Sequence, residues 1–237
     1  MTTIGVYDSG IGGLTTLKLL LARFPFCDFY YLADNKNMPF GQKSKEELED
    51  ITCSALKKLR AHSDIQVFAC NTASTTLVDA IKLVPPAIPN SLVLATPRTI
   101  ESLKERAEYK TANLQFADTE ELASLVETLA TVSARKNCLN MQDAIPYLAK
   151  RIFAFKGVQN VVLGCSHYMF LTQEISNVLG AVNFFDGNEH LLKEVENALQ
   201  DEPRAPRQAT VKFDFTLCDE SKKYQKIFSL LKNRREF

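Results

Sequence analysis

The sequence predicts an α/β protein with two pseudo-symmetric domains, each a mostly parallel sheet flanked by helices, and an active site in the cleft between them. Strand-like and helix-like segments alternate along the chain, which is typical of parallel βαβ units. A dense proline cluster at residues 84–90 divides the chain, and the segments after it repeat the order of those before it. We therefore expect residues 1–91 and 207–237 to form the first domain and residues 92–206 the second.

The first half of the chain alternates strands and helices from its beginning. Short, apolar, β-prone runs predict strands at residues 3–7, 28–32 and 65–69. Helical spacing of apolar residues predicts helices at residues 14–24, 44–60 and 73–83. A glycine-rich turn at residues 8–13 separates the first strand from the first helix.

The second half repeats this pattern after the proline cluster, which cannot continue a helix. Apolar runs predict strands at residues 91–95, 158–163 and 211–216. Helices are predicted at residues 98–109, 120–133, 145–155 and 221–233. Because residues 201–208 contain two prolines, we expect this stretch to lead back to the first domain.

The composition excludes several classes of protein. The 237 residues include 28 basic and 28 acidic side chains, so no excess positive charge favours a nucleic-acid partner. Residues 1–14 lack the basic and apolar regions of a signal peptide, and Asp8 lies where the apolar region would be. Apolar runs fall short of the roughly 18 residues of a transmembrane helix. We expect a cytoplasmic protein without a nucleic-acid or membrane partner.

Six cysteines need an explanation, because structural disulfides are rare in the cytoplasm. No two of them form a Cys-x-x-Cys pair. Cys70 and Cys165 share one setting, since each follows an apolar strand and a small residue and precedes two polar residues. The other four cysteines lack this setting, and we interpret them as packing residues: Cys27, Cys53, Cys138 and Cys218.

The setting of Cys70 and Cys165 predicts a thiol on each wall of one cleft. Ligands in open α/β sheets bind beyond the carboxyl ends of the strands, so two facing domains would aim both sulfurs at one ligand. A helix that follows each cysteine favours an anion, and we therefore expect the pKa of both thiols to be lowered. Asp8 follows the first strand, so we expect it on the same rim as Cys70, either as a functional carboxylate or as a turn residue.

Three chemistries fit these residues. Two thiols on opposite faces of a substrate can remove a proton from one face and return one to the other, which inverts a stereocentre. A single cysteine paired with His167 would instead support acyl transfer or hydrolysis. Zinc binding by Cys70, Cys165, His167 and Asp8 is a third alternative, although zinc ligands usually have tighter local spacing.

Four segments resemble motifs of the glutamate racemases, which belong to the cofactor-independent aspartate/glutamate racemase superfamily. They occur in the order of the family and span most of the chain. The segments are residues 4–14 (IGVYDSGIGGL), 39–41 (PFG) followed by Lys43 and Ser44, 69–74 (ACNTAS) and 163–168 (LGCSHY). A weaker match, residues 95–102 (ATPRTIES), resembles the pattern that opens the second domain of the family.

The resemblance implies interconversion of L-glutamate and D-glutamate by proton transfer at Cα. Cys70 would be the catalytic base towards D-glutamate and Cys165 the base towards L-glutamate, with Asp8 and His167 assisting the two thiols. The positions that match substrate-binding residues of the family are Asp8, Ser9, Phe40, Gly41, Asn71, Thr72, Ser166 and His167. Phe40 stands where the family usually has tyrosine.

The resemblance also implies a homodimer that supplies D-glutamate for peptidoglycan in the cell wall. We expect neither a cofactor nor a bound metal. One departure leaves an alternative open: residues 73–92 are predicted to lack the strand that the family places before the second domain. A diverged protein that binds an amino acid with little turnover would fit this shortened link. A racemase for aspartate or another amino acid is a further alternative, although the aspartate-specific branch usually has an acidic residue in place of His167.

Overall fold

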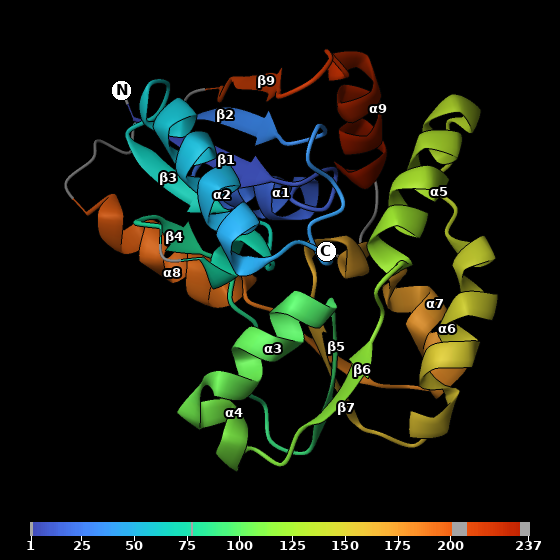
Figure 1. The fold of residues 1–237 in the computed structure, drawn as a ribbon. Coiled ribbons are helices and arrows are strands. Elements are labelled where there is room, and N and C mark those ends of the chain that lie inside the picture. Colours follow the sequence, from blue (N-terminus) through green and yellow to red (C-terminus); the bar gives the residue numbers. More distant parts are fainter. Residues whose placement is uncertain (1, 77, 201–207, 233–237) are drawn as a thin grey trace.

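The computed structural model describes residues 2–76, 78–200 and 208–232, and these form two separate sheets (Figure 1). The first sheet has five strands in the order β4-β3-β1-β2-β9, and the second has four in the order β6-β5-β7-β8. Neighbouring strands are parallel throughout both sheets. The predicted two-domain α/β class is therefore confirmed.

Helices cover both faces of the first sheet. Its strands are β1 (Thr3–Asp8), β2 (Asp28–Ala33), β3 (Ile65–Phe68), β4 (Ile81–Lys82) and β9 (Val211–Phe215). On one face, α2 (Lys45–Arg60) packs Leu56 and Leu59 against Tyr30 and Leu32. Every second side chain of β2 points to the other face of the sheet. That face packs against α1 (Leu14–Arg23) and α9 (Ser221–Lys232). The helix α8 (Asn188–Ala198) lies against α1 and β4.

The second sheet is covered in the same way. Its strands are β5 (Ser91–Ala95), β6 (Gln115–Asp118), β7 (Asn160–Gly164) and β8 (Asn183–Phe185). One face packs against α3 (Pro97–Glu105) and α4 (Ala107–Thr111). The other packs against α5 (Leu122–Lys136), α6 (Ile145–Ile152) and α7 (Thr172–Leu179). The helix predicted at residues 98–109 is interrupted at Arg106, whose backbone is extended.

One apolar core extends across both sheets. A single buried cluster contains Ile4 of β1 and Leu17 of α1. The same cluster contains Leu92 of β5, Val126 of α5 and Leu171, which belong with the second sheet. The C-terminal helix α9 lies beside α5, although β9, directly before it, belongs to the first sheet (Figure 1). Burying this shared surface stabilises the close approach of the two domains.

The prediction of a helix at residues 73–83 is wrong. The chain forms one short 3-10 turn, η1 (Ala73–Thr75), and then the two-residue strand β4. Hydroxyl groups explain the difference, because Thr75 and Thr76 donate to the carbonyls of Thr72 and Ala73 at 2.8 and 2.7 Å. Such side-chain bonds compete with the helical hydrogen bonds of the backbone. The strand that we expected this link to lack is therefore present as β4.

The domain boundaries stay a prediction. The strands β4 and β5 lie in different sheets on either side of the proline cluster. The second predicted boundary, between residues 206 and 207, lies outside the described residues, as does most of the stretch 201–208 and the end of the helix predicted at 221–233. Within the described ranges, no helix combines the length and the apolar character that a bilayer crossing requires.

Candidate active site

The carboxyl ends of three strands bring the predicted residues together between the domains. Asp8 ends β1, Cys70 comes shortly after β3, and Cys165 comes directly after β7. A cavity at this place is lined by Ser9, Met38, Pro39, Phe40, Gly41, Cys70, Thr72, Thr96, Glu120, Ala123, Cys165 and His167. Its volume is about 20 Å³, which is room for about one water molecule. Both candidate thiols therefore face one narrow, closed cleft.

Three predicted site residues do not line the cavity but are buried beside its lining residues: Asp8, Asn71 and Ser166. Asp8 accepts a hydrogen bond from Ser166 Oγ at 2.9 Å, and this bond joins the two domains. Asn71 donates from Nδ2 to the carbonyl of Leu83 at 3.0 Å. Asn71 Oδ1 is buried and accepts no hydrogen bond from the described residues.

Cys70 lies in surroundings that disfavour its thiolate. Its sulfur is 3.6 Å from Ser9 Oγ. Burial and, to a lesser extent, the carboxylate of Asp8 raise the pKa of the Cys70 thiol to about 12, against the lowering effect of hydrogen bonds from Ala73 and Ser9. The predicted lowering of this pKa is therefore wrong. The helix that was expected to lower it is the single 3-10 turn η1, whose dipole is small.

Cys165 lies beside a histidine that favours a positive charge. The sulfur is 3.8 Å from His167 Nδ1, and His167 Nε2 is 3.0 Å from Glu127 Oε1. Burial lowers the pKa of His167, but its hydrogen bonds and charge interactions with Cys165 and Glu127 outweigh burial and raise the pKa well above its usual value. A protonated imidazole at this distance stabilises negative charge on the sulfur.

Asp8 is a buried carboxylate with several donors. The Gly10 N–H donates to Oδ1 at 2.8 Å, in addition to the bond from Ser166. Burial raises the pKa of Asp8, while the charge of His167 and the hydrogen bonds from Gly10 and Ser166 oppose that rise. Asp8 thus interacts electrostatically with groups on both walls of the cleft.

Gly12 lies where the first domain packs tightly against the Cys165 wall. A Cβ atom on Gly12 would lie 2.3 Å from Ser166 Oγ, 2.6 Å from His167 Nδ1 and 2.8 Å from the His167 backbone nitrogen. Any larger residue here would displace the histidine that contacts Cys165. The glycine-rich turn therefore allows close packing of the two domains.

Several residues of the site are not among the predicted ones. Glu127 of α5 holds His167 and also accepts from the Ile11 N–H at 2.5 Å. Thr96 lies 3.0 Å from Thr72, oxygen to oxygen, across the domain boundary that we predict. Glu120 lines the cavity and accepts a hydrogen bond from Gln42 at 2.9 Å. Of these three residues, Thr96 lies in the weaker matching segment, residues 95–102, whereas Glu127 and Glu120 lie outside the matching segments.

The other four cysteines are only partly as expected. Cys27 is buried, in agreement with a packing role. Cys53, Cys138 and Cys218 are exposed, so the interpretation as packing residues is wrong for these three. Among the described residues, no group of three His, Cys, Asp or Glu side chains is arranged to hold a metal ion.

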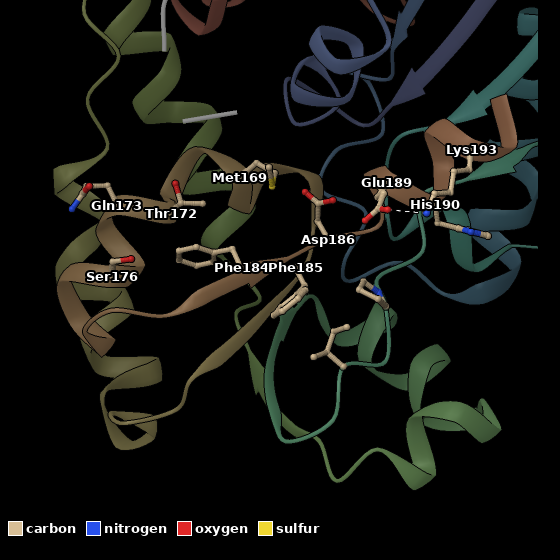
Figure 2. A pocket seen from close by; sticks show the side chains of 12 residues that line it. Met169, Thr172, Gln173, Ser176, Phe184, Phe185, Asp186, Glu189, His190 and Lys193 are labelled. Atoms are coloured by element: carbon tan, nitrogen blue, oxygen red, sulfur yellow. Dashed lines mark hydrogen bonds and ion pairs between the residues drawn. The ribbon is translucent and has the colours of Figure 1, made fainter. Parts of the chain in front are cut away.

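Neither thiol lines a larger cavity of about 870 Å³. It is lined by parts of α7, β8 and α8, and Figure 2 shows Thr172 and Ser176 on one side with His190 and Lys193 on the other. Within α8, Lys193 pairs with Glu189 at 2.8 Å and His190 Nε2 lies 3.5 Å from Glu194 Oε1, while Asp186 accepts a hydrogen bond from the Asn188 N–H at 2.7 Å. None of the predicted site residues lines it, so the small cleft remains the candidate active site.

Comparisons with known proteins identify similar chains. No protein-family model matches the chain. The glutamate racemase of Clostridium novyi is 30% identical over 207 residues, which cover 78% of each chain. That of Aliivibrio salmonicida is 31% identical and covers 82% of this chain and 79% of its own.

Solved structures with the same fold are also glutamate racemases. The Thermus thermophilus enzyme in complex with β-chloro-D-alanine has a TM-score of 0.73 at 25% identity, covering 97% of this chain and 93% of its own. The Escherichia coli enzyme in complex with L-glutamate and the activator UDP-MurNAc-Ala has a TM-score of 0.75 at 21% identity, covering 98% and 94%.

Proposed function

The chain belongs to the glutamate racemases, a family of isomerases, and on this premise we propose that it interconverts L-glutamate and D-glutamate by a two-base proton transfer. The observation that carries the proposal is that Cys70 and Cys165, from different domains, line one cavity. Two-base inversion needs a proton acceptor on one face of Cα and a donor on the other. Cys70 and Cys165 supply two such groups on opposed walls.

In the direction from L-glutamate, Cys165 is the acceptor. Its thiolate takes the Cα proton, and the Cys70 thiol donates a proton to the opposite face, so that Cys70 ends as the thiolate and Cys165 as the thiol. The reverse reaction uses the same groups in exchanged roles. The raised pKa of Cys70 and the protonated state favoured at His167 support this starting arrangement of protons.

Asp8 and His167 assist the two thiols in this scheme. His167 stabilises the thiolate of Cys165, and Glu127 keeps the imidazole oriented and protonated. Asp8 is bonded to Ser166 and raises the pKa of Cys70, so it favours the protonated form of that thiol. A carboxylate at Asp8 therefore helps to keep the proton on the Cys70 thiol, which is the donor.

Hydroxyl groups and amides hold the substrate in this proposal. Among the described residues, no lysine or arginine lines the cavity. The positions that match those holding the substrate carboxylates and ammonium group in the family are Ser9, Gly41, Asn71, Thr72, Ser166 and His167, and Phe40 stands at the usual tyrosine. The buried Asn71 Oδ1, which lacks a donor among the described residues, is available to accept from the substrate ammonium group.

Substrate entry requires the two domains to separate. A cavity of about 20 Å³ is far smaller than glutamate. Polar contacts across the cleft hold the closed form, including the hydrogen bond from Gln42 to Glu120 and that between the hydroxyls of Thr72 and Thr96. Closure around glutamate would exclude water from the thiols during proton transfer.

The wider role follows from the family. We propose that the protein acts in the cytoplasm as a homodimer, without a cofactor, and supplies D-glutamate for peptidoglycan. The family assignment supports these proposals. We also propose the division into a first domain of residues 1–91 with 207–237 and a second of residues 92–206. The helix α8, which falls within the second of these ranges, contacts α1 and β4 of the first.

Isotope exchange tests the proposed function. Purified protein incubated with L-glutamate in deuterated water is expected to give D-glutamate that carries deuterium at Cα. Binding of glutamate without exchange or inversion would instead support the diverged binding protein. Assays with both enantiomers of aspartate measure the selectivity, and a rate for aspartate equal to that for glutamate would contradict the substrate assignment.

A further inference from the structure

Tyr31 lies beneath the glycine-rich turn and does not line the cavity. Its side chain is fully buried, and its hydroxyl donates to the carbonyl of Gly10 at 2.8 Å. A Cβ atom on Gly13 would lie 2.8 Å from the same hydroxyl oxygen. The turn from Ser9 to Gly13 therefore wraps closely around one tyrosine hydroxyl of β2.

The same turn reaches both thiols. Ser9 Oγ is 3.6 Å from the sulfur of Cys70. The Ile11 N–H donates to Glu127 Oε1, the atom that also contacts His167 Nε2 beside Cys165. We propose that Tyr31 is a positioning residue whose hydroxyl holds this turn in the geometry that both halves of the site require. The proposal rests on the proposed racemase function.

The ring of Tyr31 is itself firmly held. Its centroid is 5.7 Å from that of Phe213 in β9 and 6.1 Å from that of Tyr224 in α9. Because these rings are packed in the core that joins the two domains, Tyr31 cannot follow a displaced turn. The C-terminal segment thus determines where the hydroxyl lies, and the hydroxyl determines where the turn lies.

Tyr31→Phe removes only the hydroxyl and leaves the packed ring in place. It leaves the buried Gly10 carbonyl without this donor, so the turn shifts and the contacts of Ser9 and Ile11 with the two halves of the site loosen. Because small misplacements of catalytic groups are costly, we expect kcat to fall about tenfold in both directions, with KM changed less than about twofold.

Tyr30→Phe is the matched control. Tyr30 is the neighbouring residue of β2, points to the opposite face of the sheet, and donates its hydroxyl to Asp214. Both variants lose one tyrosine hydroxyl that donates a hydrogen bond, but only Tyr31 contacts the turn. We expect Tyr30→Phe to keep the kcat of the wild-type protein.

The pH dependence of kcat separates positioning from a general loss of stability. His167 faces Cys165, Glu127 and the charge of Asp8, and Glu127 helps to keep it protonated. If Tyr31→Phe loosens the contact with Glu127, the alkaline limb of the profile moves to lower pH, in the same direction as in Glu127→Gln. The thermal unfolding curve of each variant gives the folded fraction at the assay temperature.

Two results would overturn the inference: a kcat and pH profile of Tyr31→Phe equal to those of Tyr30→Phe, or a loss of activity that vanishes after correction for the folded fraction. Inactive wild-type protein would overturn the proposed function itself. Active wild-type protein with a normal Tyr31→Phe variant would overturn only the role of Tyr31.

Discussion

The two walls of the cleft share one local sequence pattern but differ in chemistry. Cys70 and Cys165 both follow a buried parallel strand and precede a short 3-10 turn. Cys70 lies next to the hydroxyl of Ser9 and interacts with the charge of Asp8. Cys165 lies next to His167, whose pKa is raised. The difference comes from partners elsewhere in the chain, so a shared motif does not imply shared electrostatic surroundings.

This asymmetry has a consequence for turnover. In the proposed two-base scheme, proton transfer in either direction needs one thiol and one thiolate, and each turnover exchanges the two states. In the closed structure the raised pKa of Cys70 favours its thiol form, which suits Cys70 to be the donor in the proposed scheme.

Removal of either thiol tests whether both walls are needed. Cys70→Ala and Cys165→Ala are each expected to reduce racemisation by about a thousandfold or more, because neither wall alone can both accept and donate across Cα. Circular dichroism started from each enantiomer measures the rate. Cys53→Ala, which changes an exposed cysteine of α2, is the control and should keep full activity. Substantial racemisation by either variant at the cleft would contradict the two-base scheme.

Gly12→Ala disturbs the Cys165 wall directly. The new Cβ would clash with Ser166 Oγ and with both His167 atoms next to it, so kcat is expected to fall about a hundredfold. Steady-state kinetics with both enantiomers measures this loss. Gly157→Ala provides the comparison, because Gly157 has a φ of 99° but no atom within 4 Å of its would-be Cβ. That variant should lose stability through backbone strain while it keeps kcat, and an equal loss of kcat in both would remove the argument for Gly12.

Glu127→Gln weakens the charge on the Cys165 wall without changing its shape. Glu127 contributes to the raised pKa of His167, so its neutral replacement lowers that pKa. Activity that needs protonated His167 is lost as pH rises through this pKa, and the alkaline limb of kcat therefore moves to lower pH. We expect kcat at neutral pH to fall about tenfold. An unchanged pH–rate profile would show that Glu127 has no part in the protonation of His167.

The smallest expected effect is on stability at alkaline pH. The pKa of Cys70 in the folded protein is about 12, above the value of 9.0 for a free thiol, so the folded state keeps a proton that the unfolded state releases. The stability associated with this proton is fully present below pH 9.0 and decreases as pH rises towards 12. Its loss amounts to about 1 kcal/mol per pH unit, to an order of magnitude. Denaturant unfolding between these limits should show a shallower fall for Cys70→Ala than for wild-type protein, and identical slopes would contradict the raised pKa.

Much of the site could be predicted because its reactive groups lie in short local motifs. Cys70, Thr72, Cys165 and His167 line the cavity as the strand ends suggested. Glu127 could not be found in this way, since it contacts Ile11 from a position 116 residues along the chain. Tyr31 lies 21 residues from the Gly10 carbonyl that it holds, within an ordinary apolar strand that shows no motif.

The sequence by itself determined the alternation of strands and helices, the two halves of the fold and the pair of cysteines at strand ends. Those features depend on periodicity and on neighbouring residues, which are legible along the chain. Only the tertiary structure decided that the pKa of Cys70 is raised, which residues hold His167, and how residues 73–83 fold. Burial, charge and hydroxyl contacts between distant segments control these properties, and a local pattern does not contain them.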